Sequence, residues 1–260
     1  MDLILRPPIS LQERVVCIIK GILFRQINYI ILYHIDVFGY KNYFNIDPEK
    51  CIYVPFKVNQ LERIQNYLSK RARDKDPSEG DYVITAGRSL RDLNTFIIAM
   101  ANSKLPGIIL RQSSSILAHH GTFLGYKSLP TNIKEIVDYG SDTSLIHYIA
   151  NAKVVVIPRF SWDINATGIS IYLMAMALRK CVIISHGPGA TELLLHDEAI
   201  LVPPEDVNAL SKAILRAWNE DEYRNKIAEN GQKYAFSLKD ETRLHLDIIN
   251  ACYNIYKQKR

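Results

Sequence analysis

The sequence is poor in cysteine and contains no cysteines or histidines at a spacing that would hold a metal ion. Its four cysteines lie far apart, each in an apolar stretch: Cys17, Cys51, Cys181 and Cys252. This pattern indicates reduced thiols in a protein core and not disulfides, which favours a cytoplasmic protein. Because no acidic motif of the DxD type stands at a strand end either, we expect no metal and no other cofactor.

Long hydrophobic runs and a secretory signal are also absent. Two prolines interrupt the N-terminus and no cleavage-type segment follows them, which argues against a signal peptide. Residues 15–35 come closest to a membrane span, but Lys20 and Arg25 help to break this run below the roughly 18 clean residues that a span needs. The pattern predicts instead a basic amphipathic helix over about residues 11–25, which would lie on another domain or on a membrane surface.

Charge of one sign is not in large excess. The 260 residues include 32 Lys and Arg against 27 Asp and Glu, which gives a net charge of +5. This mild balance suits a protein that handles anionic small molecules or touches a membrane surface, and it does not require nucleic acid as a partner. The length suits one large domain, or one complete domain with part of a second.

From residue 80 onward, short apolar runs alternate regularly with helical patterns. Six runs are predicted as strands: residues 82–86, 107–110, 133–137, 154–157, 181–184 and 199–202. Helices are predicted at residues 91–102, 142–151, 168–179, 190–196, 206–219, 221–235 and 239–258. Continuous apolar strands that alternate with helices are typical of a parallel sheet covered on both faces. We therefore predict an α/β protein with a doubly wound, Rossmann-like sheet of about six strands.

Ligands of such a sheet bind beyond the carboxyl ends of the strands, at the point where the strand order reverses. For the common strand order, this point lies between the first and the fourth strand. Polar loops follow both of these strands, at residues 87–91 and 158–168, and a third loop with glycines follows the fifth strand at residues 186–192. We therefore expect a ligand where these three loops meet at one rim of the sheet.

The residue types of the first two loops suit an anion. Arg88 and Arg91 provide guanidinium groups that match phosphate oxygens. In the second loop, Asn165 or Thr167 would cap the following helix, and Gly168 would allow close approach of a ligand to the backbone. No acid occupies the first turn of that helix, which leaves its positive end open to a negative charge.

Four segments of the chain, in this order, carry a family resemblance: GRSLRDLNTFIIA, ANAKVVVIPR, ATGISIYLMAMALRKCVIIS and GPGATELLLHDEAILVPPEDVNALSKAI. They cover about residues 80–235 and resemble the donor-binding half of the GT-B-fold glycosyltransferases, in the family-four group called glycosyl transferases group 1. The resemblance implies transfer of a hexose from a nucleotide-diphosphate sugar to a glycan or lipid-linked acceptor. It also implies retention of configuration and a reaction without a metal.

The resemblance further implies how the chain is divided. Residues 1–55 resemble only the last elements of an N-terminal, acceptor-side domain and its linker, with predicted strands at 28–34 and 51–54 around a short helix. Residues 56–260 would form the nucleotide-sugar-binding domain with its C-terminal helices. Because most of the acceptor-side domain is not in the sequence, no catalytic residue is assigned.

The donor site that the resemblance implies lies in the three loops at the rim. Arg88 and Arg91 match the basic pair that clamps the phosphates, and the third loop matches the one that faces the sugar and the diphosphate. The predicted donor- and phosphate-binding residues are Gly87, Arg88, Arg91, Asn165, Thr167, Gly168, Gly187, Gly189 and Glu192.

The sequence departs from the family at two glutamates that usually stand eight residues apart, because Ala166 and Met174 occupy those places. Neither side chain accepts a hydrogen bond, so a non-catalytic scaffold or regulatory subunit with a degraded donor site stays open as an alternative. A dinucleotide oxidoreductase is disfavoured, since no G-x-G-x-x-G follows a strand and Arg111 stands where an acid is expected. A second copy of the chain, a partner subunit and the inner face of a membrane are further expected partners.

Overall fold

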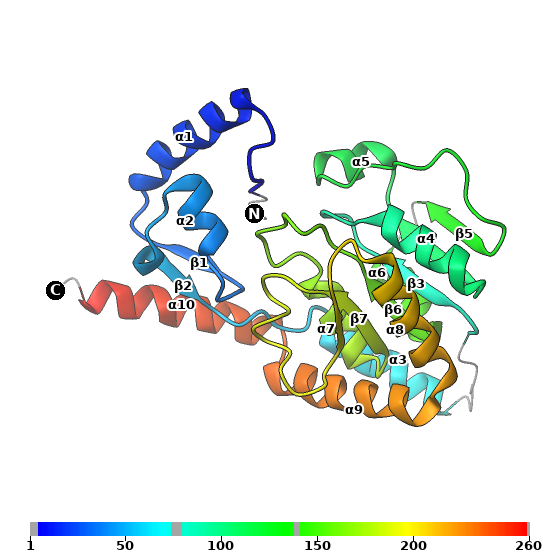
Figure 1. Cartoon of the computed structure of the whole chain (residues 1–260). Coiled ribbons are helices and arrows are strands. Elements are labelled where there is room, and N and C mark those ends of the chain that lie inside the picture. The colour runs from blue at the N-terminus through cyan, green and yellow to red at the C-terminus, as the bar shows by residue number, and fades with distance from the viewer. Residues whose placement is uncertain (1–4, 74–79, 138–140, 259–260) are drawn as a thin grey trace.

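The computed structural model describes residues 5–73, 80–137 and 141–258, and this part of the chain forms two parallel sheets. The larger sheet has six strands in the order β5-β4-β3-β6-β7-β8 (Figure 1). The strands are β3 (Val83–Ala86), β4 (Gly107–Arg111), β5 (Ile133–Val137), β6 (Val154–Ile157), β7 (Cys181–Ser185) and β8 (Ile200–Val202). Their order reverses between β3 and β6, the first and the fourth strand of this sheet, so the predicted doubly wound topology is confirmed.

Helices cover both faces of the large sheet. The helices α4 (Leu93–Ser103) and α8 (Val207–Asn219) cover one face, and α3 (Leu61–Arg73), α6 (Asp142–Asn151), α7 (Ile169–Ala177) and α9 (Asp221–Leu238) cover the other. Successive side chains of a strand point to opposite faces of the sheet, so the apolar residues of β6 contribute to the hydrophobic core on each face. Val154 and Val156 pack on the first face, and Val155 and Ile157 pack on the second.

Helix α7 is buried nearly all round, as its composition predicts. All of its residues except Ser170 are buried, because it lies between the sheet and the helices α3, α6 and α9. It begins after Gly168, whose φ of 92° places it in the left-handed region, and no side chain caps it. The predicted caps are therefore wrong, since Asn165 bonds to the backbone of Leu5 and the Thr167 hydroxyl donates to Asp163.

The first part of the chain forms a small separate layer around the two-stranded sheet. Strand β1 (Ile30–Leu32) pairs with β2 (Cys51–Tyr53), and the helices α1 (Leu11–Arg25) and α2 (Phe38–Phe44) and a short 3-10 turn, η1 (Pro48–Lys50), accompany them. Helix α1 packs on α2 through Gly21, where a Cβ atom would lie 2.5 Å from the Phe44 carbonyl oxygen. Only glycine allows the two helices to come this close.

Helix α10 (Glu241–Gln258) connects the two layers at the end of the chain. It leaves the helices of the large sheet and runs alongside the β1–β2 layer (Figure 1). Lys57, in the linker after β2, forms an ion pair of 2.9 Å between its Nζ and Oδ2 of Asp247 on this helix. The nearly buried lysine fixes the linker against α10.

One predicted helix is not formed. Residues 190–193 form turns and residues 194–196 have no regular structure, so the bond from the Leu194 N–H to the Ala190 carbonyl is not continued into a helix. Asp197 then takes a positive φ of 58°, and one turn is too short to offset the cost of helix nucleation. Between β4 and β5, where no element was predicted, the chain forms a short helix, α5 (Ser114–His119).

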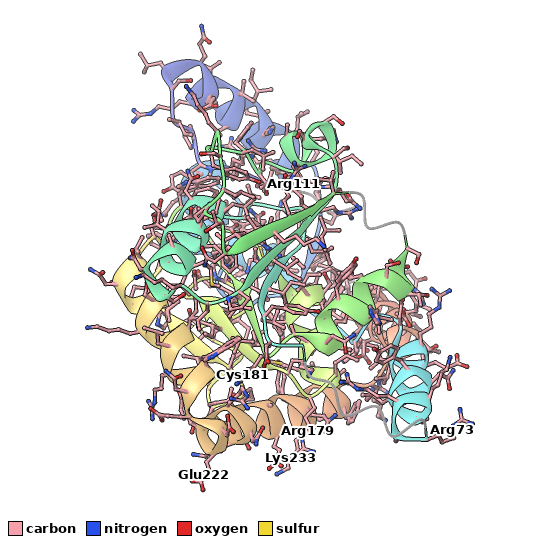
Figure 2. All side chains as sticks on the ribbon, turned by 90° about the vertical axis from the view of Figure 1, so that its right-hand side faces the viewer. Arg73, Arg111, Arg179, Cys181, Glu222 and Lys233 are labelled. Carbon is pink, nitrogen blue, oxygen red and sulfur yellow. The ribbon has the colours of Figure 1, made fainter. Side chains whose placement is uncertain are left out.

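The cysteines follow the prediction in part. All four are free, and Cys17 and Cys181 are buried, whereas Cys51 is half-buried and Cys252 is exposed on α10, so the predicted core position is wrong for the last. Figure 2 shows Cys181 within the side-chain-filled interior, while Arg73 on α3 points outward.

Candidate functional site

A pocket of about 510 Å³ lies between the two layers, at the predicted rim of the large sheet. One wall is β1 with the residues that follow it, as far as His34. The opposite wall consists of the loops after β3 and β6 and the first turns of α7. Six of the predicted donor-binding residues line this pocket: Gly87, Arg88, Arg91, Asn165, Thr167 and Gly168. The structure therefore brings the loops after the first and the fourth strand together at one cavity.

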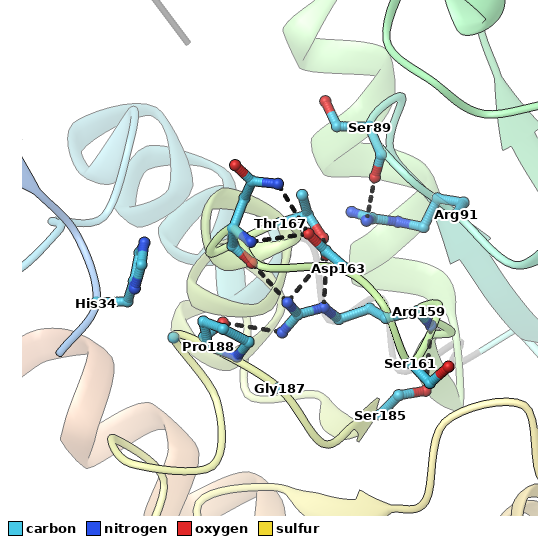
Figure 3. A network of polar contacts seen from close by, with 12 residues as sticks. His34, Ser89, Arg91, Arg159, Ser161, Asp163, Thr167, Ser185, Gly187 and Pro188 are labelled. Atoms are coloured by element: carbon cyan, nitrogen blue, oxygen red, sulfur yellow. Dashed lines mark hydrogen bonds and ion pairs between the residues drawn. The ribbon is translucent and has the colours of Figure 1, made fainter. Parts of the chain in front are cut away.

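Arg91 supplies a buried positive charge at the pocket wall. Its Nε donates to the Ala86 carbonyl at 3.1 Å. Its Nη1 donates to the Ser89 carbonyl at 2.7 Å (Figure 3). A Cβ atom on Gly87 would lie 2.6 Å from its Nη2, and one on Gly168 would lie 3.3 Å away. Both glycines therefore make room for the guanidinium beside the start of α7.

The charge of Arg91 persists at neutral pH. Its pKa is lowered to about 10, mainly by burial; the nearby Arg159 contributes to the lowering, and Asp163 opposes it. A pKa of about 10 still leaves the guanidinium protonated at pH 7. The positive end of α7 and this cation act in the same direction, so this side of the pocket favours an anion.

A buried ion pair shapes the loops after β6 and β7. Nε and Nη2 of Arg159 donate to Oδ2 of Asp163 at 3.1 and 3.0 Å, and both side chains are almost fully buried. The guanidinium also donates to the carbonyls of Pro188 and Asn165, at 2.9 and 2.6 Å (Figure 3). Gly187 lies against it, since a Cβ atom there would be 3.1 Å from its Cζ. Arg159 was not among the predicted site residues, and in the structure it joins the loops after β6 and β7.

Two of the predicted donor-binding side chains join the two layers. Nδ2 of Asn165 donates to the Leu5 carbonyl at 2.8 Å, and its Oδ1 accepts from the Leu5 N–H at 3.1 Å. Oε1 of Glu192 accepts from the N–H groups of Gly189 at 2.7 Å and Ile35 at 3.2 Å. Both side chains therefore hold the N-terminal layer against the rim, in addition to any role toward a ligand.

The positions of the two family glutamates lie at the same pocket. Ala166 and Met174 both line it, and Met174 is buried with 4% of its surface exposed. Gly189 approaches Ala166 closely, since a Cβ atom on the glycine would lie 2.6 Å from the alanine Cβ. Gly187, Gly189 and Glu192 do not belong to the pocket lining, but Gly189 and Glu192 stand directly behind it.

His34 is a polar residue of the pocket that sequence reasoning missed. The residue is buried, with 3% of its surface exposed, and its ring centroid lies 5.4 Å from that of Tyr40. Its Nδ1 lies 2.7 Å from the Asp36 carbonyl oxygen. A carbonyl only accepts, so Nδ1 carries the proton and donates. Burial lowers the pKa of His34, although Asp36 and Glu192 raise it and Arg159 lowers it further. The ring is therefore neutral, with a lone pair on Nε2.

The described ranges contain neither a cluster of metal ligands nor a helix that could span a membrane. No three His, Cys, Asp or Glu side chains in residues 5–73, 80–137 and 141–258 are grouped closely enough to hold a metal ion. Within the same ranges, no helix has the length and hydropathy that crossing a bilayer requires. The expected absence of a metal stays a prediction.

Comparisons with known proteins show which family the C-terminal part of the chain resembles. Residues 118–234 match the family described as glycosyl transferases group 1. No curated protein sequence matches the chain.

The fold has close counterparts among solved structures. Sucrose-phosphate synthase from Thermosynechococcus elongatus superposes with a TM-score of 0.73 at 18% identity, covering 96% of this chain and 65% of that structure. Alr3699/HepE from Anabaena, solved in complex with UDP and glucose, gives 0.70 at 16% identity, with 96% and 70% covered. A glycosyltransferase from Rickettsia africae gives 0.63 at 15% identity, with 96% and 67% covered. The chain thus spans about two thirds of the length of these structures.

Proposed function

Because this chain has the GT-B fold and its residues 118–234 match the glycosyl transferases group 1, we propose that it is a glycosyltransferase whose pocket binds a nucleotide-diphosphate sugar. The sugar is a hexose, and it passes to a glycan or to a lipid-linked acceptor. This proposal extends the shared fold to an activity, and the pocket between the two layers supports it.

One observation carries the proposal: a protonated, buried arginine stands beside the uncapped start of α7 in the wall of a 510 Å³ pocket. Arg91 and the positive end of the α7 dipole together offer positive charge to an anion. Arg88, in the same wall, adds a second guanidinium. A diphosphate group suits this arrangement better than an uncharged ligand does. The UDP complex of the similar Alr3699/HepE supports a uridine nucleotide as the first candidate.

The chemistry that we propose follows from these charges. Transfer of a hexose releases a nucleoside diphosphate, and negative charge develops on the oxygen that links it to the sugar. Preorganised cations stabilise that charge without a metal ion. Arg91 is held in place by two carbonyl groups before any ligand arrives, so it loses little conformational freedom on binding. Retention of configuration is our default for the reaction.

A second candidate function rests on the missing carboxylates. Ala166 and Met174 offer no acceptor to a ligand, and Asn165 and Glu192 are engaged with the backbone of the N-terminal layer. These facts favour a non-catalytic module that keeps the fold and uses it as a scaffold or regulatory subunit. Such a module could still bind the nucleotide, but it would not transfer the sugar.

Thermal denaturation with a panel of UDP-, GDP- and ADP-linked sugars and the free nucleotides separates the two. A ligand at 100 times its dissociation constant stabilises a protein by about 2.7 kcal/mol, which raises Tm by roughly 5–10 °C for a domain of this size. We expect one nucleotide series to raise Tm, and the sugar nucleotide of that series to be hydrolysed or transferred. Binding without turnover, with acceptors of both classes present, would favour the non-catalytic module. No stabilisation by any of the ligands would contradict the proposal.

A further inference from the structure

Polar atoms that lack a hydrogen-bond partner gather at the same pocket. Among the described residues, buried side-chain atoms without a partner include Nε2 of His34, Oε1 of Gln60 and Oε1 of Gln112, and all three residues line the pocket between the layers. A buried polar atom without a partner costs free energy, so such atoms in one cavity indicate a ligand that completes their bonds.

His34 is the most informative of the three. The oxygen and nitrogen of a glutamine amide are interchangeable in assignment, whereas the contact of His34 Nδ1 with the Asp36 carbonyl fixes which ring nitrogen carries the proton. Nε2 is then an acceptor and cannot donate. An anionic phosphate oxygen also only accepts, so it gains nothing from this atom. A hydroxyl group can donate to it.

The location of His34 separates it from the cationic side of the pocket. Arg91 lies beside Gly87 and Gly168, whereas the Cβ of His34 is 3.8 Å from the position of a Cβ on Gly189, next to Ala166. Figure 3 shows the imidazole and the Arg91 guanidinium on opposite sides of the loop that carries Thr167. A ligand whose phosphates face Arg91 would therefore present another of its parts to His34.

We infer that His34 determines which sugar the pocket accepts, by receiving a hydrogen bond on Nε2 from a hydroxyl group of the donor hexose. This inference rests on the proposed function and deepens it. His34 lies beside Ala166, whose own side chain offers no acceptor, so the imidazole provides one at the end of β1. It acts as a positioning residue for the sugar, and the nucleoside diphosphate binds independently of it.

The test compares UDP with UDP-glucose on wild type and on two variants, by calorimetric titration. His34→Asn keeps a donor for the Asp36 carbonyl and removes the acceptor at Nε2, whereas His34→Gln places an amide oxygen near the Nε2 position. We expect His34→Asn to weaken the binding of UDP-glucose by about tenfold, in line with the loss of one buried hydrogen bond. The affinity for UDP should change by less than about twofold. His34→Gln should recover part of the loss. UDP with added free glucose shows whether the hydroxyl must belong to the donor.

The outcomes separate this inference from the proposed function. An unchanged ratio of UDP-glucose to UDP affinity in His34→Asn overturns the inference while leaving the glycosyltransferase proposal intact. Equal weakening of both ligands also overturns it, because His34 would then support the nucleotide or the pocket walls. A loss that appears only with free glucose would place the hydroxyl on an acceptor and refute the donor assignment. If neither ligand binds wild type while another nucleotide does, the same comparison is made with that nucleotide and its glucose conjugate. Binding of no nucleotide at all contradicts both proposals.

Discussion

The buried pair of Arg159 and Asp163 gives a prediction about the stability of the rim. Replacing Arg159 by Met removes two bonds to Asp163 and the donors of the Pro188 and Asn165 carbonyls, but retains most of the apolar volume. The Asp163 carboxylate then stays buried without its counter-charge. Breaking a buried ion pair in this way costs about 3–5 kcal/mol. For a protein of this size, the Tm should fall by roughly 6–20 °C.

The assay is chemical denaturation of wild type, Arg159→Met, Asp163→Asn and the double variant. Arg159→Met leaves a buried carboxylate and Asp163→Asn leaves a buried guanidinium, whereas the double variant contains neither. It should therefore be more stable than the sum of the single changes predicts, by at least about 1 kcal/mol. Lys226→Met is the matched control, because Lys226 and Asp197 form a pair of 3.2 Å with both side chains about two thirds exposed. Removing that pair should cost less than about 1 kcal/mol.

Two results would refute this reasoning. One is an Arg159→Met variant within about 1 kcal/mol of wild type, which would mean that water or a neighbouring donor replaces the guanidinium. The other is strict additivity of the two single changes, which would mean that the pair is not coupled.

Three shorter predictions concern the ligand and pH. Arg88→Ala should weaken UDP by about 10- to 100-fold, the range of one charge-assisted hydrogen bond, while Tm without ligand changes little; an unchanged UDP affinity would place the phosphates elsewhere. Met174→Glu should tighten UDP binding if the ribose lies at α7, and an unchanged affinity in a folded variant would show that it does not. Because burial lowers the pKa of His34, the folded protein binds fewer protons than the unfolded chain, so stability should fall as pH drops through about 6.5. Denaturation between pH 8 and 5 should show a shallower slope for His34→Asn, and equal slopes would contradict the buried neutral ring.

The large sheet follows from local patterns in the sequence. Runs such as Val154–Ile157 are apolar at every position, and only a strand covered on both faces buries all of their side chains. Because a helix follows each strand, the strands lie parallel. The crossover from one strand through a helix to the next is right-handed, and this restricts the possible strand orders to a few. The meeting of the loops after β3 and β6 follows from that order, which is why six predicted residues line one pocket.

The remaining features depend on contacts that no local pattern encodes. The position of Asn165 before α7 predicts a helix cap. Its side chain instead forms a hydrogen bond with the backbone of Leu5, which is 160 residues away in the sequence. In the sequence, Arg159 is an ordinary basic residue of a loop. Only the fold places Asp163 and two carbonyl groups around its guanidinium. His34 lies in a different layer from the six predicted residues that line the pocket, so its role required knowledge of how the two layers meet.

Helix α1 presents apolar side chains on two opposite faces, and only one of them is covered. Cys17 and Gly21 are buried against the N-terminal layer. The opposite face is exposed: Leu11 by 78%, Val15 by 56%, Ile18 by 63%, Ile19 by 53%, Ile22 by 53% and Leu23 by 63%. Monomeric soluble proteins rarely expose a contiguous apolar surface of this kind. We therefore predict that the face is covered, by a second copy or a partner subunit or by a membrane surface.

Salt and one pair of variants separate these occupants. Association through the apolar face alone should persist or strengthen in high salt, whereas attraction of Lys20 and its basic neighbours to anionic lipid should weaken. Ile18→Glu should abolish either kind of association, whereas Lys20→Glu should reduce only the binding to anionic vesicles. Light scattering reports the oligomeric state, and sedimentation with vesicles of anionic and neutral lipid reports the membrane contact. If the wild-type chain is a monodisperse monomer and binds to neither kind of vesicle, this face is exposed to solvent. The requirement for a partner would then be wrong.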